Sequence, residues 1–510
     1  TEFASKSDNA DRGSYEETNT KVLNYDGDFS VTYGKLINEK HMINTVGGMR
    51  LSQNGSDKSG YKVQGFIDDE FSNPAFALGY QEDGKATYMD SKNRALSYYL
   101  NFGYSYDDRY LLDLNYRADG SSVFGSDKQF TNTWSVGLGW NIHNEAFFES
   151  VSGISLLKLR ASIGNPGNQN FNDYISTRVY SYNTNNMNIF GSSAIVSNLG
   201  NRGLEWQKTL DRNIGFDLVI VDNRLRVNFD YFNKKTDPLL VHIGTPSSTG
   251  ATTIPRNVGK QITQGVNVTL NYSIIRRDDM FWSVNANMRH QTSEYRNVSD
   301  VLTKYNLDNR NRNLTRYYDG GSPSDLWAVR SCGIDPATGR EIFLTKEGKQ
   351  TFVHDYDDEM VVGNSDPDVE GVIGTSFYYK GFSASINLRY RLGGQIFMQT
   401  LYDKVENLSS VKKWENLDKR ALYDRWKQPG DKAKFKSIAD SEVTPISSRF
   451  VEDNNVLSGE SISLGYESTG KWLSRIGASS MSFRAYMNDI FRVSTVKNER
   501  GLSYPFARSV

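Results

Sequence analysis

The chain has 510 residues, and its 59 Lys and Arg against 60 Asp and Glu give a net charge of −1. This balance excludes a bulk electrostatic attraction to nucleic acid or to an anionic membrane surface. Aromatic residues form 13% of the chain and prolines number only 11, a composition that argues against disorder. The single cysteine, Cys332, excludes an internal disulfide framework and a cysteine-built zinc site, and we expect it to be an incidental thiol. No stretch approaches the ~18 apolar residues of a membrane-spanning helix.

Hydrophobic side chains recur with a period of two along most of the chain. In residues 109–117, Asp113 and Asn115 lie on one face of the predicted strand, opposite a row of apolar side chains formed by Tyr110, Leu112, Leu114 and Tyr116. The same alternation is found in residues 132–142, 224–234 and 382–392. This pattern is typical of a strand that meets an apolar solvent on one face and water on the other.

The alternation predicts about 14 strands of roughly 10–14 residues, close to the ~9–11 that a tilted strand needs to cross a bilayer. The predicted spans are 27–38, 40–52, 94–106, 109–118, 131–143, 154–164, 209–221, 224–235, 259–274, 280–292, 369–379, 382–393, 459–468 and 480–489. Strands of globular proteins are mostly shorter, at about 5–6 residues. The sequence therefore favours an all-β protein, a transmembrane antiparallel β-barrel.

Short and long connections alternate along the chain. The turns within consecutive strand pairs are short, such as Asp107-Asp108 and Asp222-Asn223. Most connections between pairs are long: 53–93, 165–208, 236–258, 293–368 and 394–458. An up-and-down barrel would place all tight turns on one rim and all long loops on the other, as outer-membrane barrels do with their periplasmic turns and extracellular loops. Residues 411–426, in the last long loop, carry apolar side chains at helical spacing and predict a short helix.

Several segments taken together resemble the SusC/RagA family of TonB-dependent outer-membrane transporters over essentially the whole chain. The segments that carry this resemblance are RASIGNPGN (160–168), NRGLEWQ (201–207), DYFNKKTDPLL (230–240), NVGKQITQGVN (257–267), GIDPATGR (333–340), VGNSDP (362–367), YYKGFSASINLRYRL (378–392), RWKQPGD (425–431) and ISLGY (462–466). Each segment is weakly diagnostic, whereas their order and spacing are specific.

The resemblance implies a 22-stranded barrel that contains an N-terminal plug and imports oligosaccharides or peptides across the outer membrane. It also implies two partners, a SusD-like surface lipoprotein that acts as a lid and the TonB complex, which acts through the plug. We therefore expect residues 1–510 to be the C-terminal part of such a barrel. The plug, about seven first strands and the last strand would lie outside these residues.

The sequence offers no residues with catalytic, cofactor-binding or metal-binding spacing, so we expect no enzyme activity and no cofactor. The five histidines are scattered, and no HExxH motif or phosphate-binding loop is present. Substrate would then contact polar lumen-facing residues and aromatic side chains of the long loops, where sugars stack on ring faces. The candidates are Tyr180, Tyr182, Trp327 and Trp414.

Three outward rings, Tyr110, Trp134 and Trp140, are predicted to belong to the aromatic girdle at the membrane interface instead. Two other functions stay open at this point. A soluble, secreted all-β glycan-binding or hydrolytic protein would fold without detergent and carry a cleft with paired carboxylates. A passive porin would have an open lumen and no plug.

Overall fold

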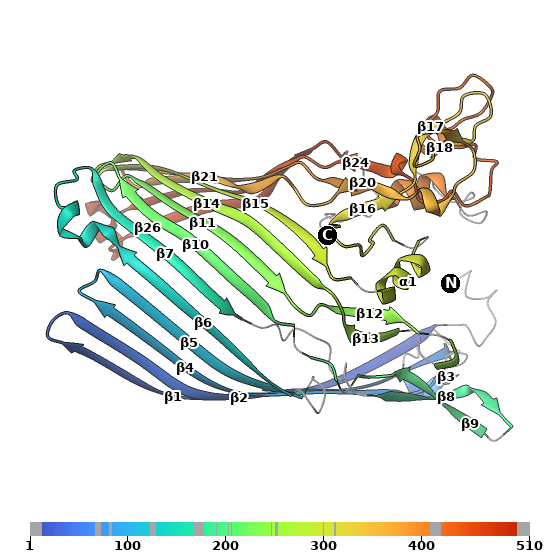
Figure 1. Cartoon of the computed structure of the whole chain (residues 1–510), viewed down its shortest axis with the longest axis horizontal. Helices are drawn as coiled ribbons and strands as arrows, with labels where there is room; N and C mark the ends of the chain where they lie inside the picture. Colours follow the sequence, from blue (N-terminus) through green and yellow to red (C-terminus); the bar gives the residue numbers. More distant parts are fainter. Residues whose placement is uncertain are drawn as a thin grey trace.

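The computed structural model describes residues 13–66, 73–80, 84–122, 129–166, 178–189, 191–201, 203–205, 207–245, 247–249, 253–298, 300–310, 313–408 and 420–496. Fourteen strands pair along one antiparallel path and form a curved wall (Figure 1). In spatial order they are β1 (Ser14–Ile37), β2 (His41–Phe66), β4 (Thr87–Tyr106), β5 (Tyr110–Ser121), β6 (Phe130–Asn141), β7 (Ile154–Asn165), β10 (Thr209–Ile220), β11 (Leu225–Thr236), β14 (Lys260–Arg276), β15 (Met280–Arg296), β21 (Val369–Tyr379), β22 (Phe382–Leu392), β25 (Val456–Ser468) and β26 (Met481–Ser494). A further strand, β3 (Ala77–Tyr80), pairs with β2 beside this path.

All fourteen predicted strands are present, and the prediction of an all-β wall with long loops is confirmed. The strand predicted at 369–379 coincides with β21. Three strands extend furthest beyond their predicted limits: β1 begins at Ser14, β2 continues to Phe66 and β4 begins at Thr87. Much of the loop expected at 53–93 is therefore a continuation of the wall, paired in unbroken register from Thr20↔Lys58 to Ile37↔His41.

Tight turns close the strand pairs at one end of the wall, on the left of Figure 1. Asn38, Glu39, Asp107 and Asp108 all have positive φ angles, between 51° and 58°. Consecutive residues of this kind form the hairpin turns whose twist matches that of the flanking strands. Two of the connections between paired strands are longer and contain short helices. The connection from β6 to β7 contains η4 (Ile142–Asn144) and η5 (Ala146–Phe148), and the connection from β25 to β26 contains η11 (Lys471–Ile476).

The long loops gather at the opposite end of the wall, on the right of Figure 1, where they form small sheets and helices of their own. The strands of these loops are β8 (Val179–Asn188), β9 (Gly191–Asn198), β12 (Leu240–Gly244), β13 (Thr253–Asn257), β16 (Asp325–Ala328), β17 (Arg330–Ile334), β18 (Glu341–Leu344), β19 (Gln350–Thr351), β20 (Met360–Asn364), β23 (Gln395–Phe397) and β24 (Val451–Asp453). The helices are α1 (Asp300–Asp308), α2 (Gln399–Leu401), α3 (Arg420–Tyr423) and the π-helical η8 (Tyr402–Glu406), with single turns η3 (Pro74–Phe76), η6 (Ser247–Thr249), η7 (Tyr356–Asp358) and η10 (Ser448–Phe450).

The helix predicted at 411–426 is only partly testable, because residues 411–419 lie outside the described ranges. Within the described part, α3 covers Arg420–Tyr423. None of the helices in the described residues has the length and apolar content that crossing a bilayer demands.

Among the described residues, two clusters of buried apolar side chains involve the loops. One contains Val405 and Phe450, and another contains Leu302 together with Tyr295 of β15. The wall instead leaves its apolar row open: Tyr110 is 48% exposed and Tyr116 is 47% exposed. An apolar row that no described segment covers fits a wall whose outer face meets hydrocarbon.

Candidate functional site

The polar face of the wall is its inner face. Cross-strand register places Asn115 of β5 beside Ser135 of β6, and Ser162 of β7 beside Asn213 of β10. This face is hollowed between β1 and β10 into a concavity of about 820 Å³. The side chains that line it include Asp28, Arg50, Tyr99, Asn101, Asn115, Arg117, Arg160, Asn165, Asp211 and Asn213. These groups offer hydrogen bonds and fixed charges, so the concavity can bind a polar ligand or a polypeptide segment.

Arg160 of β7 is the best-connected cation on this inner face. Its Nε lies 2.9 Å from Oδ2 of Asp217 on β10, and its Nη2 lies 3.1 Å from Oδ1 of Asp230 on β11. Asn228 of β11 donates to Asp217 as well, at 2.6 Å. One guanidinium therefore links three neighbouring strands, which a point charge such as lysine does less well.

A second polar group lies on β1, β2 and β4. Arg50 donates to Asp26 at 2.7 Å, and the Tyr99 hydroxyl donates to Asp28 at 2.9 Å. The inner face is therefore ordered by cross-strand pairs before any ligand arrives.

The predicted girdle residues lie on the outer face. The rings of Tyr110 and Trp140 stack with their centroids 6.4 Å apart and their planes 17° from parallel. Trp134 pairs in register with Tyr116 on the same face. Aromatic side chains at this level are typical of the membrane interface.

Among the described residues, two of the predicted substrate residues lie on one hairpin and a third lies on a different strand. Tyr180 and Tyr182 lie on β8, which pairs only with β9 among the described strands, and this hairpin lies on the other side of the loop end from β16 in Figure 1. Tyr180 is 55% exposed. Trp327 lies on β16, and Trp414 falls outside the described residues.

Trp327 packs against Tyr318, with ring centroids 4.7 Å apart and planes tilted by 31°. Its indole Nε1 is buried and has no hydrogen-bond partner among the described residues. Buried polar groups are nearly always paired, and this indole N–H is an exception. Trp327 is consequently the candidate with the most specific local geometry.

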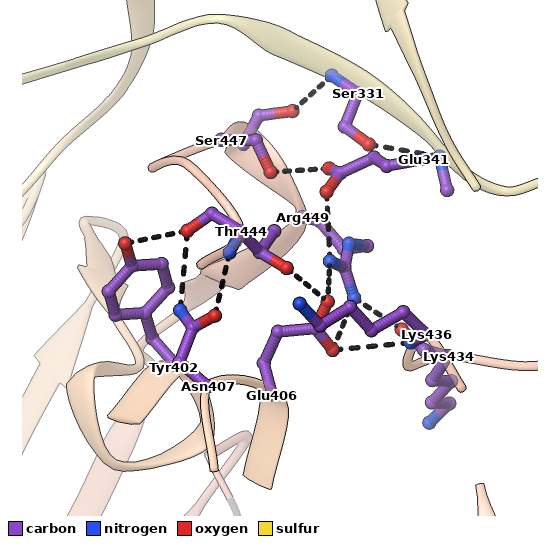
Figure 2. A network of polar contacts seen from close by, with 12 residues as sticks. Ser331, Glu341, Tyr402, Glu406, Asn407, Lys434, Lys436, Thr444, Ser447 and Arg449 are labelled. Carbon is purple, nitrogen blue, oxygen red and sulfur yellow. Dashed lines mark hydrogen bonds and ion pairs between the residues drawn. The ribbon is translucent and has the colours of Figure 1, made fainter. Parts of the chain in front are cut away.

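The largest polar network of the loops was not predicted from the sequence. Figure 2 shows Arg449 between Glu341 and Glu406: its Nη2 lies 2.9 Å from Glu341 and 2.6 Å from Glu406. Ser447 donates to Glu341 at 2.6 Å, and Thr444 donates to Glu406 at 3.0 Å. Arg449 and Glu341 are 108 positions apart, so no local pattern could have indicated their contact.

Both the charge and the burial of this network are unusual. The side chains of Arg449, Glu341 and Glu406 are 10%, 6% and 0% exposed. Burial alone would lower the pKa of Arg449, but the two carboxylates outweigh it and raise the pKa. The guanidinium is therefore permanently charged and holds three loop segments together.

The family-like segments are joined in pairs. Asn257 donates to the Glu205 carbonyl at 3.0 Å and accepts from the Glu205 amide at 2.8 Å, which joins segments 257–267 and 201–207. Trp426 donates to the Pro336 carbonyl at 2.9 Å, which joins segments 425–431 and 333–340. These residues act as clasps between loops and do not line the inner concavity.

No group of three or more His, Cys, Asp or Glu side chains able to hold a metal ion is present among the described residues. Cys332 is a free, exposed thiol. Neither observation identifies a metal-binding or reactive group on the inner face.

Comparison with known proteins agrees with this architecture. Over 95% of the chain, the sequence is 26% identical to TonB-dependent receptor P39 of Formosa agariphila, and the match covers 50% of that receptor. Over 75% of the chain it is 24% identical to TonB-dependent receptor SusC of Bacteroides thetaiotaomicron, covering 38% of SusC. The RagAB peptide transporter shares the fold, with a TM-score of 0.82 at 20% identity over 95% of this chain and 53% of the other.

The chain thus spans about half the length of the curated relatives it matches. The model of the TonB-dependent receptor-like β-barrel family matches residues 2–408, which is most of the chain. The resemblance read from the sequence segments is confirmed by this match. The chain belongs to the TonB-dependent receptor-like β-barrel family, and its wall lies in the outer membrane.

Proposed function

We propose that this chain is the wall of an outer-membrane importer that takes up oligosaccharides or peptides with energy from TonB. The observation that carries the proposal is the two-faced wall, with an uncovered apolar outer face and a hollow inner face of about 820 Å³ lined by charged and amide side chains. The fold shared with the RagAB peptide transporter supports the same function. A SusD-like surface lipoprotein would cover the loop end as a lid.

The other parts of the proposed importer would come from residues outside these 510. The path of wall strands leaves β1 and β26 each paired on one side only among the described strands. Each unpaired backbone group in hydrocarbon costs several kcal/mol, so a wall of this kind needs further strands to close it. We propose that those strands, and a plug that contacts TonB, belong to a longer polypeptide of which residues 1–510 are the C-terminal part.

We further propose that cargo contacts the loop residues Tyr180, Tyr182, Trp327 and Trp414. Aromatic faces stack on sugar rings and on peptide side chains alike. Trp327 would offer the exposed part of its ring, since its indole Nε1 is buried. The chain would hold cargo without altering it, so no enzymatic step is assigned.

Uptake by cells that carry the full-length protein and its lipoprotein tests this function. Growth on a candidate glycan or peptide should be lost without TonB, whereas a passive porin would conduct in its absence. Calorimetry on the intact complex would identify the cargo, and the Trp327→Ala variant should weaken its binding. Trp472, which is 49% exposed on η11 away from the loops, supplies the matched control Trp472→Ala. Cargo that is cleaved, or uptake that does not need TonB, would refute the proposal.

A further inference from the structure

A groove of about 540 Å³ runs over the outer face of strands β14, β15, β21, β22 and β25. It is lined almost wholly by apolar atoms, and its volume is within the ~300–1,000 Å³ of small-molecule sites. The groove lies next to β26, which is one end strand of the described path, but neither end strand lines it.

One cross-strand row of side chains explains the groove. Register pairs Ile275 with Trp282, Trp282 with Phe377, Phe377 with Ala384, and Ala384 with Leu464. Ala384 is the single small residue in a row of large ones, and it leaves a depression between Phe377 and Leu464.

The polar atoms beside this depression are already satisfied. The indole Nε1 of Trp282 donates to Oγ1 of Thr375 at 2.9 Å. An apolar ligand therefore breaks no hydrogen bond when it binds, and it can pack against the ring of Trp282.

A cation lies at the end of the groove nearest the tight turns. Met280, which lines the groove, pairs in register with Tyr379, and Tyr379 pairs with Phe382. The ammonium of Lys380, in the turn that follows, lies 5.2 Å from the centroid of the Tyr379 ring. The turn thus holds a positive charge at the membrane rim, directly beyond the apolar row.

We propose that this groove binds one phospholipid, with an acyl chain over Ala384 and the headgroup phosphate at Lys380. The outer face of the wall meets hydrocarbon, so an acyl chain is the apolar occupant that this groove encounters. A basic side chain at the rim attracts an anionic headgroup, with an effect of about fivefold in affinity per residue. Lys380 directly follows Tyr379, whose register partner Met280 lines the groove, and this succession of apolar and charged groups suits an amphipathic ligand. The site does not depend on the transport function or on the cargo.

The second outer groove provides an internal comparison. It has a volume of about 480 Å³ and is lined by Leu100, Leu114 and Val136 among others. Neither groove has a basic residue in its lining, so the second groove serves as a control for the filling of an apolar surface alone.

The test uses the full-length protein, purified in detergent and stripped of lipid, and titrates it with a phosphatidylglycerol that carries bromine on its acyl chains. Bromine quenches tryptophan fluorescence on contact, so Trp282 should report binding that saturates at one equivalent. Ala384→Phe should abolish the saturable quenching, and Lys380→Gln should weaken the midpoint about fivefold. The matched control Val136→Phe should leave the midpoint unchanged.

Three results would overturn the proposal. The first is quenching that rises without saturating in the unaltered protein. The second is a Lys380→Gln midpoint equal to that of the unaltered protein, which decides the matter even where Ala384→Phe does not fold. The third is equal binding of a brominated diacylglycerol, which carries no phosphate.

Discussion

Replacing Arg449 by methionine should open the loop assembly without disturbing the wall. Methionine keeps an unbranched apolar stem in a similar volume, but it leaves the carboxylates of Glu341 and Glu406 buried with no cation between them. Removing one partner of a buried ion pair costs about 3–5 kcal/mol, mostly because the other charge stays desolvated. At ~1.4 kcal/mol for each factor of ten, the lower bound raises the local opening constant by about two orders of magnitude.

Hydrogen exchange measured by mass spectrometry on the full-length protein checks this value. Amides of β18 and η8 should exchange about a hundredfold faster in Arg449→Met, while amides of β14 and β15 keep their rates. The control is Arg310→Met, which breaks the pair with Asp357 at 3.1 Å, where the side chains are 30% and 79% exposed. Exposed pairs contribute about 0–1 kcal/mol, so this control should change exchange less than about fivefold. Equal exchange in Arg449→Met and the unaltered protein would show that the network does not hold the loops.

Three further predictions concern the loops. Burial lowers the pKa of His354 below 6.5, so the unfolded loops take up the proton first and loop stability should fall as the pH drops through 6.5; His354→Phe should remove this dependence in exchange measurements. Gly339→Ala places a Cβ within 2.6 Å of the Trp426 ring, and should shift the Trp426 fluorescence and cost more stability than Gly348→Ala, which has a similar positive φ but open space around it. Asn257→Ala leaves the amide and carbonyl of its partner segment unpaired, and should lower the protection of β13 by about 1–3 kcal/mol, whereas an unchanged exchange rate would contradict the proposed clasp.

The strands of the wall could be predicted because the residues of each strand alternate between apolar and polar, according to the solvent that each face meets. Where hydrocarbon faces one side, apolar and polar residues must alternate, and the predicted limits of 369–379 agree with β21. Beyond the hydrocarbon both faces meet water, and the alternation disappears while the backbone ladder continues. Residues such as Asn19 and Lys58 lie in these extensions of β1 and β2, which is why the sequence predicted the strands too short there.

The loop assembly could not be predicted in the same way, because its contacts are long-range. Arg449 meets Glu341 and Glu406 across 108 and 43 positions, and Trp327 meets Tyr318 through a fold of the same loop. Ring-bearing residues could be selected as substrate candidates by type and loop position alone. Their separation onto β8 and β16 follows from strand pairing within the loops, which periodicity does not report.

Contacts between the family-like segments bear on why the family is recognisable from them. Arg160 reaches Asp230, Asn257 reaches Glu205, and Trp426 reaches Pro336, so six of the nine segments are joined in pairs. A substitution on one side of such a pair leaves a buried or half-buried polar group without its partner, at a cost of about 1–3 kcal/mol.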